Sequence, residues 1–455
     1  MIPTTAAFDA KRNTTPQQAV WVLTLPGLSL TYASRAEAAV NATATWMKVP
    51  TGVTQKIEDL QGKASVGSLQ VEIVDVNHAL LAKFATTTWY GQAANLLLGF
   101  SGLAYPGDYI TVFAGVVETV VPSKDHTAWI FSVRDKNRIL KNRVYAVGDD
   151  GVNPTSTKNP RTLYGNPLAL VTSLLETELK LPAAAIDTAS IANLQNGRFA
   201  ATTMLFSLTK PVDALTFLAQ QLLMPHGLFH FARYDGRIAI GDMLAAPSPV
   251  PIAFNFIDSN IIGAPDYAQK AIYNWVEMQM DYDGSKYLHV EEFYDGDSAT
   301  RYGLSSVLSI KSDGLRTNLQ GASRAGITAR RIFQRYANGP TGEISFDHPS
   351  LQACVVEVGD YVTVTSRLLE NLQAGTMGVT SRIYQVMHVQ PQWANGRIQF
   401  TLLDIDAIAT RPAYQYAPDT QPAWPTATVA QRAEYLFQAN ASNQQSDGSA
   451  AGRIF

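Results

Sequence analysis

The chain has 455 residues, of which 46% are apolar, 10% aromatic and 16% charged, and its formal net charge is -3. This length exceeds what one hydrophobic core usually serves, so we expect three or four domains. The small acidic balance argues against a dedicated nucleic-acid-binding protein, which would carry a strong basic excess. A single cysteine excludes an internal disulfide framework.

Charged residues are rarer here than in most soluble domains, where they make up about a quarter of the chain. One interpretation is that much of the surface is buried against partners in an assembly; the other is an Ala- and Thr-rich soluble protein. The first residues do not have the pattern of a signal peptide. Apolar runs such as 94–100 are too short to span a bilayer. We therefore expect the product to fold in the cytoplasm.

The first third of the chain predicts a β domain. Residues 1–19 are polar and lack periodicity, so we expect an N-terminal arm that is extended and ordered only by a partner. The elements expected next are a hairpin over 21–32 with its turn at Pro26-Gly27, a strand over 66–75, a short helix over 76–84 and a strand over 129–135. Together they predict a first β-barrel domain over 20–155.

A short motif occurs twice. In residues 355–365, alternating apolar and threonine positions are interrupted by Gly359-Asp360, which predicts two short strands joined by a tight turn. Residues 106–118 are a near copy, in which Gly107-Asp108 is again followed by tyrosine. Two copies of one β unit predict an internally duplicated barrel scaffold.

The middle of the chain changes period. Residues 148–161 have the composition of a linker. Beyond them we expect helices over 168–179 and 211–224, and a hairpin that joins 229–233 to 237–240 across Tyr234-Asp235-Gly236. These elements predict a small α+β domain over 156–248.

The last part predicts a second β domain over 249–406. Its expected elements are strands over 273–282 and 287–290, a helix over 322–336 and a hairpin that joins 381–389 to 396–404 across Asn395-Gly396. Prolines then exclude regular structure, which predicts an extended C-terminal tail over 407–455. The fold class expected is therefore mainly β with α+β parts.

The residues that could carry chemistry do not form a known catalytic or metal-binding pattern. His226 and His230 are four apart, but Pro225 and Gly227 argue against one shared helix, so we expect exposed loop and strand histidines without metal. Cys354 stands in an apolar run and is expected to be buried. The adjacent carboxylates Asp149-Asp150 and Glu291-Glu292 are expected to be solvated charges. We expect no catalytic residue, no metal, no cofactor and no enzymatic activity.

Two basic segments allow more than one interpretation. Residues 134–143 are the most basic window, and they could face a phosphate backbone or form a solvated surface at a domain edge. The helix over 322–336 carries four arginines with the same two interpretations, and salt bridges between subunits are a third. These arginines are Arg324, Arg330, Arg331 and Arg335.

In their order along the chain, several motifs resemble tailed-phage (siphophage) baseplate hub proteins. The segments that carry the resemblance are 62–75, 97–100, 107–118, the helix over 322–336 followed by 351–365, the strand over 396–404, and the end over 446–455. The resemblance implies a T4-type hub fold with two tail-tube-like β-barrel domains. It also implies that three copies form a ring, which adapts the sixfold tail tube to the threefold tip and forms part of the DNA ejection channel.

The same resemblance implies partners and a location. The partners would be the chain itself as a homotrimer, the distal tail protein, the tail tube protein, the tape measure protein and tail fibre or tip proteins, with transient passage of DNA without sequence-specific binding. The location would be the virion, at the tail tip. The chain departs from some hubs in having no lysozyme-like insertion, no large C-terminal receptor-binding region and no cysteine cluster, so cell-wall digestion and receptor choice would belong to other proteins.

Two other functions stay open at this point. A distal tail protein of the upper baseplate ring would be hexameric and would carry one tube-like barrel. A carbohydrate-acting enzyme built on β domains would need paired carboxylates, for which Asp281 and Asp283 are the candidates.

Overall fold

The structure is a computed structural model. It describes residues 1–37, 40, 46–65, 67–84, 86–145, 161–247, 249–303, 307–337, 341–371, 375–405, 437–438 and 452–453. The fold is mainly β with α+β parts, as the sequence predicts. Most of the expected linker and C-terminal tail lie outside the described residues; the described part of the tail is a two-residue pairing of β24 (Phe437–Gln438) with β25 (Gly452–Arg453).

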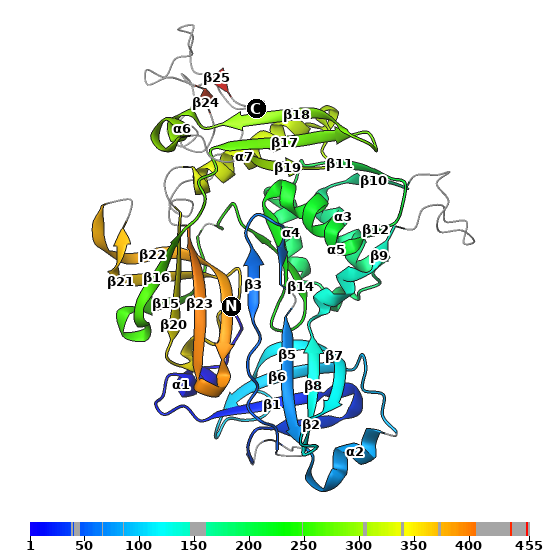
Figure 1. The fold of residues 1–455 in the computed structure, drawn as a ribbon, viewed down its shortest axis with the longest axis vertical. Coiled ribbons are helices and arrows are strands. Elements are labelled where there is room, and N and C mark those ends of the chain that lie inside the picture. The colour runs from blue at the N-terminus through cyan, green and yellow to red at the C-terminus, as the bar shows by residue number, and fades with distance from the viewer. Residues whose placement is uncertain are drawn as a thin grey trace, which may run out of the picture.

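The first barrel lies at one end of the long axis (Figure 1), and its strand order is β2-β1-β6-β7-β8-β5. The strands are β1 (Ala19–Leu25), β2 (Leu30–Ala33), β5 (Ser68–Val74), β6 (Ala93–Phe100), β7 (Ile110–Pro122) and β8 (Ala128–Arg134), with helix α2 (Ala79–Phe84) outside them. Residues 46–48 connect the outer strands. Met47 N donates to Ala33 O of β2 at 3.1 Å, and Lys48 N donates to Glu72 O of β5 at 2.9 Å. All strand pairs are antiparallel, and this connection closes the sheet.

The second barrel is the curved part of a ten-stranded sheet, with the order β15-β21-β22-β23-β20-β16. Its strands are β15 (Ile252–Ile257), β16 (Ile262–Gln269), β20 (Gly342–His348), β21 (Tyr361–Asn371), β22 (Thr376–Gln392) and β23 (Arg397–Asp404). The outer strands β15 and β16 are consecutive in the chain, and β15 runs parallel to β21. The outer strands of the second barrel are therefore not paired with each other, whereas residues 46–48 connect those of the first barrel.

The remaining strands of this sheet come from other parts of the chain. Strand β3 (Gln55–Glu58) pairs with β22, and β4 (Lys63–Ala64) pairs with β3 and β13 (Leu228–Ala232). The last strand is β14 (Ile238–Asp242). Figure 1 shows β3 rising from the first barrel between the other parts of the molecule. One short segment of the first predicted domain thus joins the second barrel to the α+β part.

The α+β part holds the two helical segments that the sequence predicts. Its elements are β9 (Arg143–Val144), β10 (Arg161–Gly165), α3 (Pro167–Ser173), η4 (Leu174–Glu178), α4 (Thr188–Asn196), β11 (Met204–Leu208), β12 (Val212–Asp213), α5 (Ala214–Thr216), η6 (Phe217–Leu223) and η7 (Met224–His226). Asn166 caps α3 by accepting a hydrogen bond from Leu168 N at 2.9 Å, and Pro167 fills the first helical position. The predicted hairpin is β13 and β14, with Gly236 in its turn at φ +76°.

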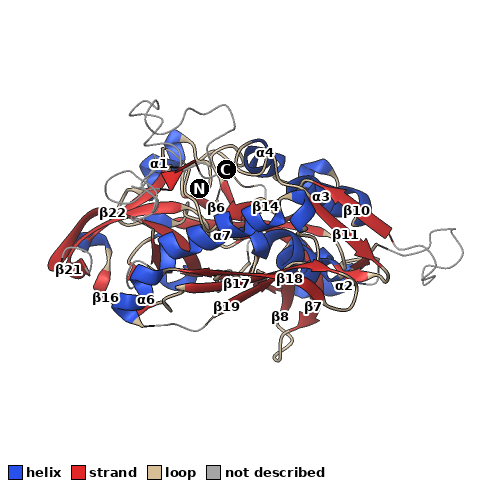
Figure 2. Ribbon diagram, turned by 90° about the horizontal axis from the view of Figure 1, so that it is seen from above, coloured by secondary structure: helices blue, strands red, loops and turns tan. Residues whose placement is uncertain are grey.

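A small sheet and a long helix cover the other end of the molecule. The sheet holds β17 (Trp275–Tyr282) between β18 (Tyr287–Tyr294) and β19 (Leu308–Lys311), and α6 (Gly296–Tyr302) follows β18. Helix α7 (Gly321–Tyr336), the predicted third helix, packs against β17 and β18, as Figure 2 shows from above. Ala325, Ala329 and Ile332 recur at helical spacing and are fully buried.

Two hydrophobic cores stabilise this arrangement. One runs without interruption through both barrels, and the other joins the α+β part to the three-stranded sheet and α7. Trp21 of β1 contacts Trp393 of the 3₁₀ turn η11 (Trp393–Asn395), with ring centroids 4.6 Å apart. The two barrels are therefore packed on each other as one unit.

The N-terminal segment is not the extended arm that the sequence predicts. It forms helix α1 (Ala6–Arg12), capped by Thr5, whose hydroxyl accepts a hydrogen bond from Phe8 N at 3.1 Å. Phe8 is fully buried, and its ring lies 5.1 Å from that of Phe100. Phe8 thus anchors the helix on the first barrel, and one apolar side chain in a polar segment gives no periodicity from which this could be predicted.

Candidate interaction site at the junction of the barrels

The N-terminal segment contacts both Gly-Asp turns. The Thr5 hydroxyl donates to Asp108 Oδ1 at 2.8 Å. At the second turn, the Met1 ammonium donates to Asp360 Oδ1 at 2.5 Å. Nearby, Ile2 N donates to Val355 O at 2.8 Å, and the Arg12 guanidinium donates to Gln352 O in the 3₁₀ turn η10 (Leu351–Ala353). The two copies of the motif, which are about 250 residues apart in the chain, are thus held by one segment.

The second copy of the motif does not fold as two strands. Only β21 follows it, and Val355–Val358 form an irregular segment whose side chains are buried. Gly359 N donates to Val386 O at 2.8 Å, and Val386 N donates to Asp360 O at 2.8 Å, so the turn itself is tied to β22. The alternation in the sequence reports burial between the barrels and not a strand, which is why the prediction is wrong here.

The first copy forms a different turn. Asp108 N donates to Ala104 O at 2.8 Å and Tyr109 N donates to Pro106 O at 3.1 Å, so this turn is closed by its own backbone. After the turn, both copies continue in the same way, because β7 and β21 each form an antiparallel hairpin with the next strand. Their other neighbours differ: β6 is antiparallel to β7, whereas β15 is parallel to β21.

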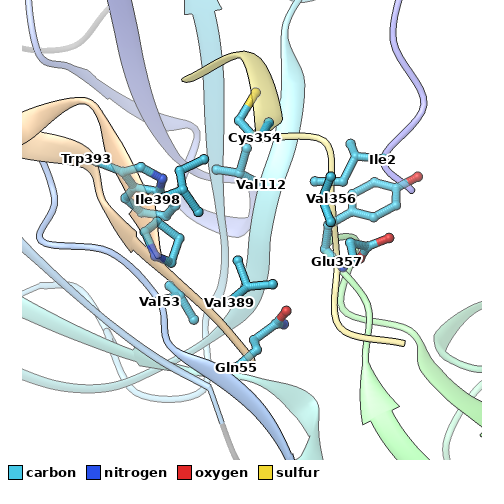
Figure 3. Close-up of a pocket in the computed structure, with 13 residues that line it drawn as sticks. Ile2, Val53, Gln55, Val112, Cys354, Val356, Glu357, Val389, Trp393 and Ile398 are labelled. Carbon is cyan, nitrogen blue, oxygen red and sulfur yellow. The ribbon is translucent and has the colours of Figure 1, made fainter. Parts of the chain in front are cut away.

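A small cavity of about 40 Å³ lies where the barrels and the N-terminal segment meet (Figure 3). The walls come from both barrels and from Ile2, and they are mainly apolar. The wall residues labelled in the figure are Ile2, Val53, Gln55, Val112, Cys354, Val356, Glu357, Val389, Trp393 and Ile398. Cys354 is buried, as the sequence predicts, and burial keeps the pKa of its thiol far above the ordinary value.

Glu357 is the buried carboxyl beside this cavity. Its Oε1 accepts a hydrogen bond from Tyr234 N at 2.8 Å, and its Oε2 lies 3.5 Å from the Arg233 guanidinium. Burial raises the pKa of Glu357, and the negative charge of Asp360 raises it further, while the N-terminal ammonium and Arg233 oppose both. The α+β hairpin is thereby attached to the second Gly-Asp turn through one acid.

A larger cleft of about 1130 Å³ opens on the other side of this turn. Its walls are α4, the β13–β14 hairpin, α7 and residues 357–361. Four arginines line it: Arg198, Arg233, Arg324 and Arg331. Arg198 pairs with Asp242 and donates to His226 O at 2.8 Å, and Arg233 donates to Asp187 Oδ2 at 2.6 Å. The cleft is therefore a concave site in which four arginines come together.

The two histidines considered as metal ligands are buried, not exposed as expected. His226 lies in η7 beside Phe199 and Met204, and His230 lies on β13 with neither ring nitrogen hydrogen-bonded in the described part of the chain. Burial lowers the pKa of His226 to about 3 and that of His230 to about 4. Among the described residues no three acidic, histidine or cysteine side chains gather as a metal site.

The carboxylates considered for catalysis hold loops. Asp281 accepts hydrogen bonds from Thr317 N at 3.1 Å and from the Thr317 hydroxyl at 2.7 Å. Asp283 accepts hydrogen bonds from Ser285 N at 2.8 Å and from Lys286 N at 2.9 Å. Glu291 and Glu292 are neighbours on β18, and Asp149-Asp150 lies outside the described residues. The structure gives the pair Asp281 and Asp283 a role in turns.

The basic window over 134–143 is partly buried. Arg134 and Arg138 both pair with Glu118 of β7, at 2.6 and 2.9 Å. Asp135 is 2% exposed and accepts hydrogen bonds from Gly67 N at 2.6 Å and Asn137 N at 3.1 Å. The interpretation as a solvated surface fits Arg138, Lys141 and Arg143, which are exposed. It does not fit Asp135, which is buried because it caps the 3₁₀ turn η3 (Lys136–Lys141).

Sequence reasoning missed most of the cleft. Of its arginines, Arg324 and Arg331 were considered on the helix, but Arg198, Arg233 and their acids lie on separate elements with no shared motif. The only available signal was the basic character of the helix.

None of the helices in the described ranges is long and apolar enough to cross a membrane.

Comparison with known proteins gives similarity in fold only. No protein-family model and no curated protein matches the sequence. Solved structures similar to the chain include a 43 kDa tail protein of prophage MuSo2 from Shewanella oneidensis (15% identity, TM-score 0.47, 86% of this chain and 99% of that one), and a tail protein from Neisseria meningitidis MC58 (11%, 0.48, 86% and 99%). A third is prophage tail protein gp18 from Listeria monocytogenes EGD-e (10%, 0.43, 85% and 94%). All three are described as tail proteins, and two of them as prophage proteins. Identities and TM-scores this low assign no function.

Proposed function

We propose that this chain is a structural protein of a phage tail baseplate, and that three copies form the hub ring at the tail tip. The observation that carries the proposal is the pair of barrels packed on one continuous core, with Trp21 against Trp393. A chain with two joined barrels offers six barrels when three copies assemble. That arrangement adapts a sixfold tube to a threefold tip, and the space inside the ring would form part of the DNA ejection channel.

The second barrel carries a surface suited to the ring contact. Its outer strands β15 and β16 expose four large apolar side chains, which are 37% to 45% accessible: Ile252, Ile257, Ile262 and Tyr267. Large exposed apolar side chains on the outer strands of a sheet favour a subunit interface. Strand β16 also has one edge unpaired among the described strands, because its one partner is β20. We assign this surface to the contact between copies.

The other roles follow from the ring. Its partners would be the distal tail protein, the tail tube protein, the tape measure protein and tail fibre or tip proteins. DNA would pass without sequence-specific contacts, in keeping with a formal charge of -3. The role is structural and not enzymatic. The virion tail tip is the proposed location.

The oligomeric state of the purified protein tests the proposal. Size-exclusion chromatography with light scattering should give a trimer at micromolar concentration. Ile257→Lys should convert it to monomers, because a lysine in an apolar contact must be desolvated. The matched control is Leu288→Lys on β18, which is 61% exposed and outside the assigned surface. A stable monomer would contradict the proposal, and a hexamer would favour a distal tail protein.

A further inference from the structure

We propose that the arginine-lined cleft binds an extended acidic segment of a partner protein, with a carboxylate of that segment on Arg331. The cleft lies between the α+β part and the second barrel, and the surface assigned to the ring contact is on β15 and β16. The two proposals are therefore independent. Either can fail without the other.

Arg331 is a cleft arginine for which the described residues supply no hydrogen bond and no ion pair. Its Nη1 atom is buried. Asp242 is the carboxylate whose charge favours the charged form of Arg331, but Asp242 already forms an ion pair with Arg198. Burial lowers the pKa of Arg331 to about 10, and the charge of Arg198 adds to that effect. A guanidinium that is largely withdrawn from water and has no ion pair of its own destabilises the folded chain, and an arriving carboxylate would offset this.

Two neighbouring arginines form ion pairs with acids of the chain, and the cleft keeps an excess of positive charge. Arg198 holds Asp242, while Arg233 holds Asp187 and approaches Glu357. The raised pKa of Glu357 reduces the negative charge that this wall presents. A guanidinium matches a carboxylate through two parallel hydrogen bonds, which makes an acidic side chain or a chain terminus the fitting ligand group.

The walls favour a peptide over a small anion. At about 1130 Å³ the cleft is larger than the roughly 300–1,000 Å³ of ordinary small-molecule sites. Leu194, Phe231 and Ile327 line it and are partly exposed, so apolar side chains of a peptide would find contacts beside the arginines. Alternating acidic and apolar residues fit this lining.

Fluorescence anisotropy with labelled peptides tests the inference on the full chain. The probe is a fluorescein-labelled hexapeptide of alternating Leu and Glu, and its control has Gln in place of Glu. We expect the Glu peptide to bind about tenfold or more tightly than the Gln peptide, with an affinity that falls as salt rises. A labelled oligothymidylate of six nucleotides serves as the nucleic-acid arm.

Arg331→Met gives the sharpest readout, because binding and stability should move in opposite directions. The affinity for the Glu peptide should fall about tenfold or more, and the melting temperature should rise, since an unpaired buried charge is replaced by an apolar side chain of similar length. Arg301→Met removes the same charge from exposed α6 and should change neither quantity. Arg331→Gln is the second variant and should weaken binding in the same direction.

Four results would overturn the inference. They are no binding of the Glu peptide by the unmodified chain at about 1 mM, equal binding of the Glu and Gln peptides, tighter binding of oligothymidylate than of peptide, and unchanged peptide affinity in both Arg331 variants. Each of these leaves the trimer measurement unaffected.

Discussion

The two barrels are built from similar hairpins but finished differently. In the first barrel all strands are antiparallel and residues 46–48 connect the outer strands. In the second barrel β15 is parallel to β21, and the outer strands remain open toward solvent. The difference teaches that a repeated turn and hairpin define only the middle of a sheet. The neighbours of that hairpin, and so the surface available to other subunits, depend on segments outside the repeat.

The contact between the barrels gives the largest expected effect. Trp393→Ala removes the ring packed on Trp21 and should lower the free energy of unfolding by roughly 3–5 kcal/mol. Unfolding followed by tryptophan fluorescence in urea checks this. The control is Trp46→Ala, whose side chain is 56% exposed and should change stability by less than about 0.5 kcal/mol. Equal effects of both variants would mean that the barrels do not depend on each other.

The barrels should respond oppositely to pH. In the first barrel, burial raises the pKa of Asp135 to about 6. The unfolded carboxyl ionises near pH 4, so this contribution is complete at lower pH and is lost as pH rises through about 6, by up to roughly 3 kcal/mol. In the second barrel, burial lowers the pKa of His348, so its contribution is present above about pH 6.5 and is lost as pH falls.

Two variants separate these pH contributions. Asp135→Asn should remove the decline in stability between about pH 4 and 6. His348→Asn keeps a donor for Ser350 O and should reduce the loss of stability on the acid side. Urea midpoints measured at intervals of pH give both slopes. If neither variant changes its slope, the buried groups do not titrate as their surroundings require.

The two Gly-Asp turns should differ in their tolerance of a side chain. Gly359 has φ +83°, and a Cβ there would lie 3.3 Å from Phe229. Gly359→Ala should therefore cost roughly 1–2 kcal/mol. Gly107 lies outside the left-handed region with nothing within 4 Å, so Gly107→Ala should be neutral or stabilising by up to about 1 kcal/mol. Thermal unfolding compares them, and equal costs would show that the turns are equivalent.

The smallest effect is expected where the N-terminal segment joins the first barrel. Thr5→Ala removes the cap of α1 and the contact with Asp108, and should cost about 1 kcal/mol. Thr14→Ala, an exposed threonine that bonds only Lys11 O in the described structure, is the matched control and should change stability by less than about 0.5 kcal/mol. A loss in the control equal to that of Thr5→Ala would contradict the assigned role.

Local pattern predicted the hairpins and α7 well, because each depends on residues close in the sequence. The turn of the hairpin over 21–32 and the apolar stripe of the helix over 322–336 each lie within one continuous segment. The pattern failed where partners are distant. Strand β3 is short and polar, and it is a strand only because β22 and β4 flank it. Likewise Arg331 and Asp242 both line the cleft, although they lie almost 90 positions apart in the sequence.

Strand β3 also determines how the chain can be divided. It lies early in the sequence, yet it supplies the hydrogen bonds of β22 near His388, and β4 just after it supplies those of β13. A fragment that begins after residue 160 would lack both strands and leave these backbone groups unpaired. The C-terminal part of the chain therefore lacks strands that its own sheet needs, and recombination between related genes would have to keep β3 and β4 together with these distant partners.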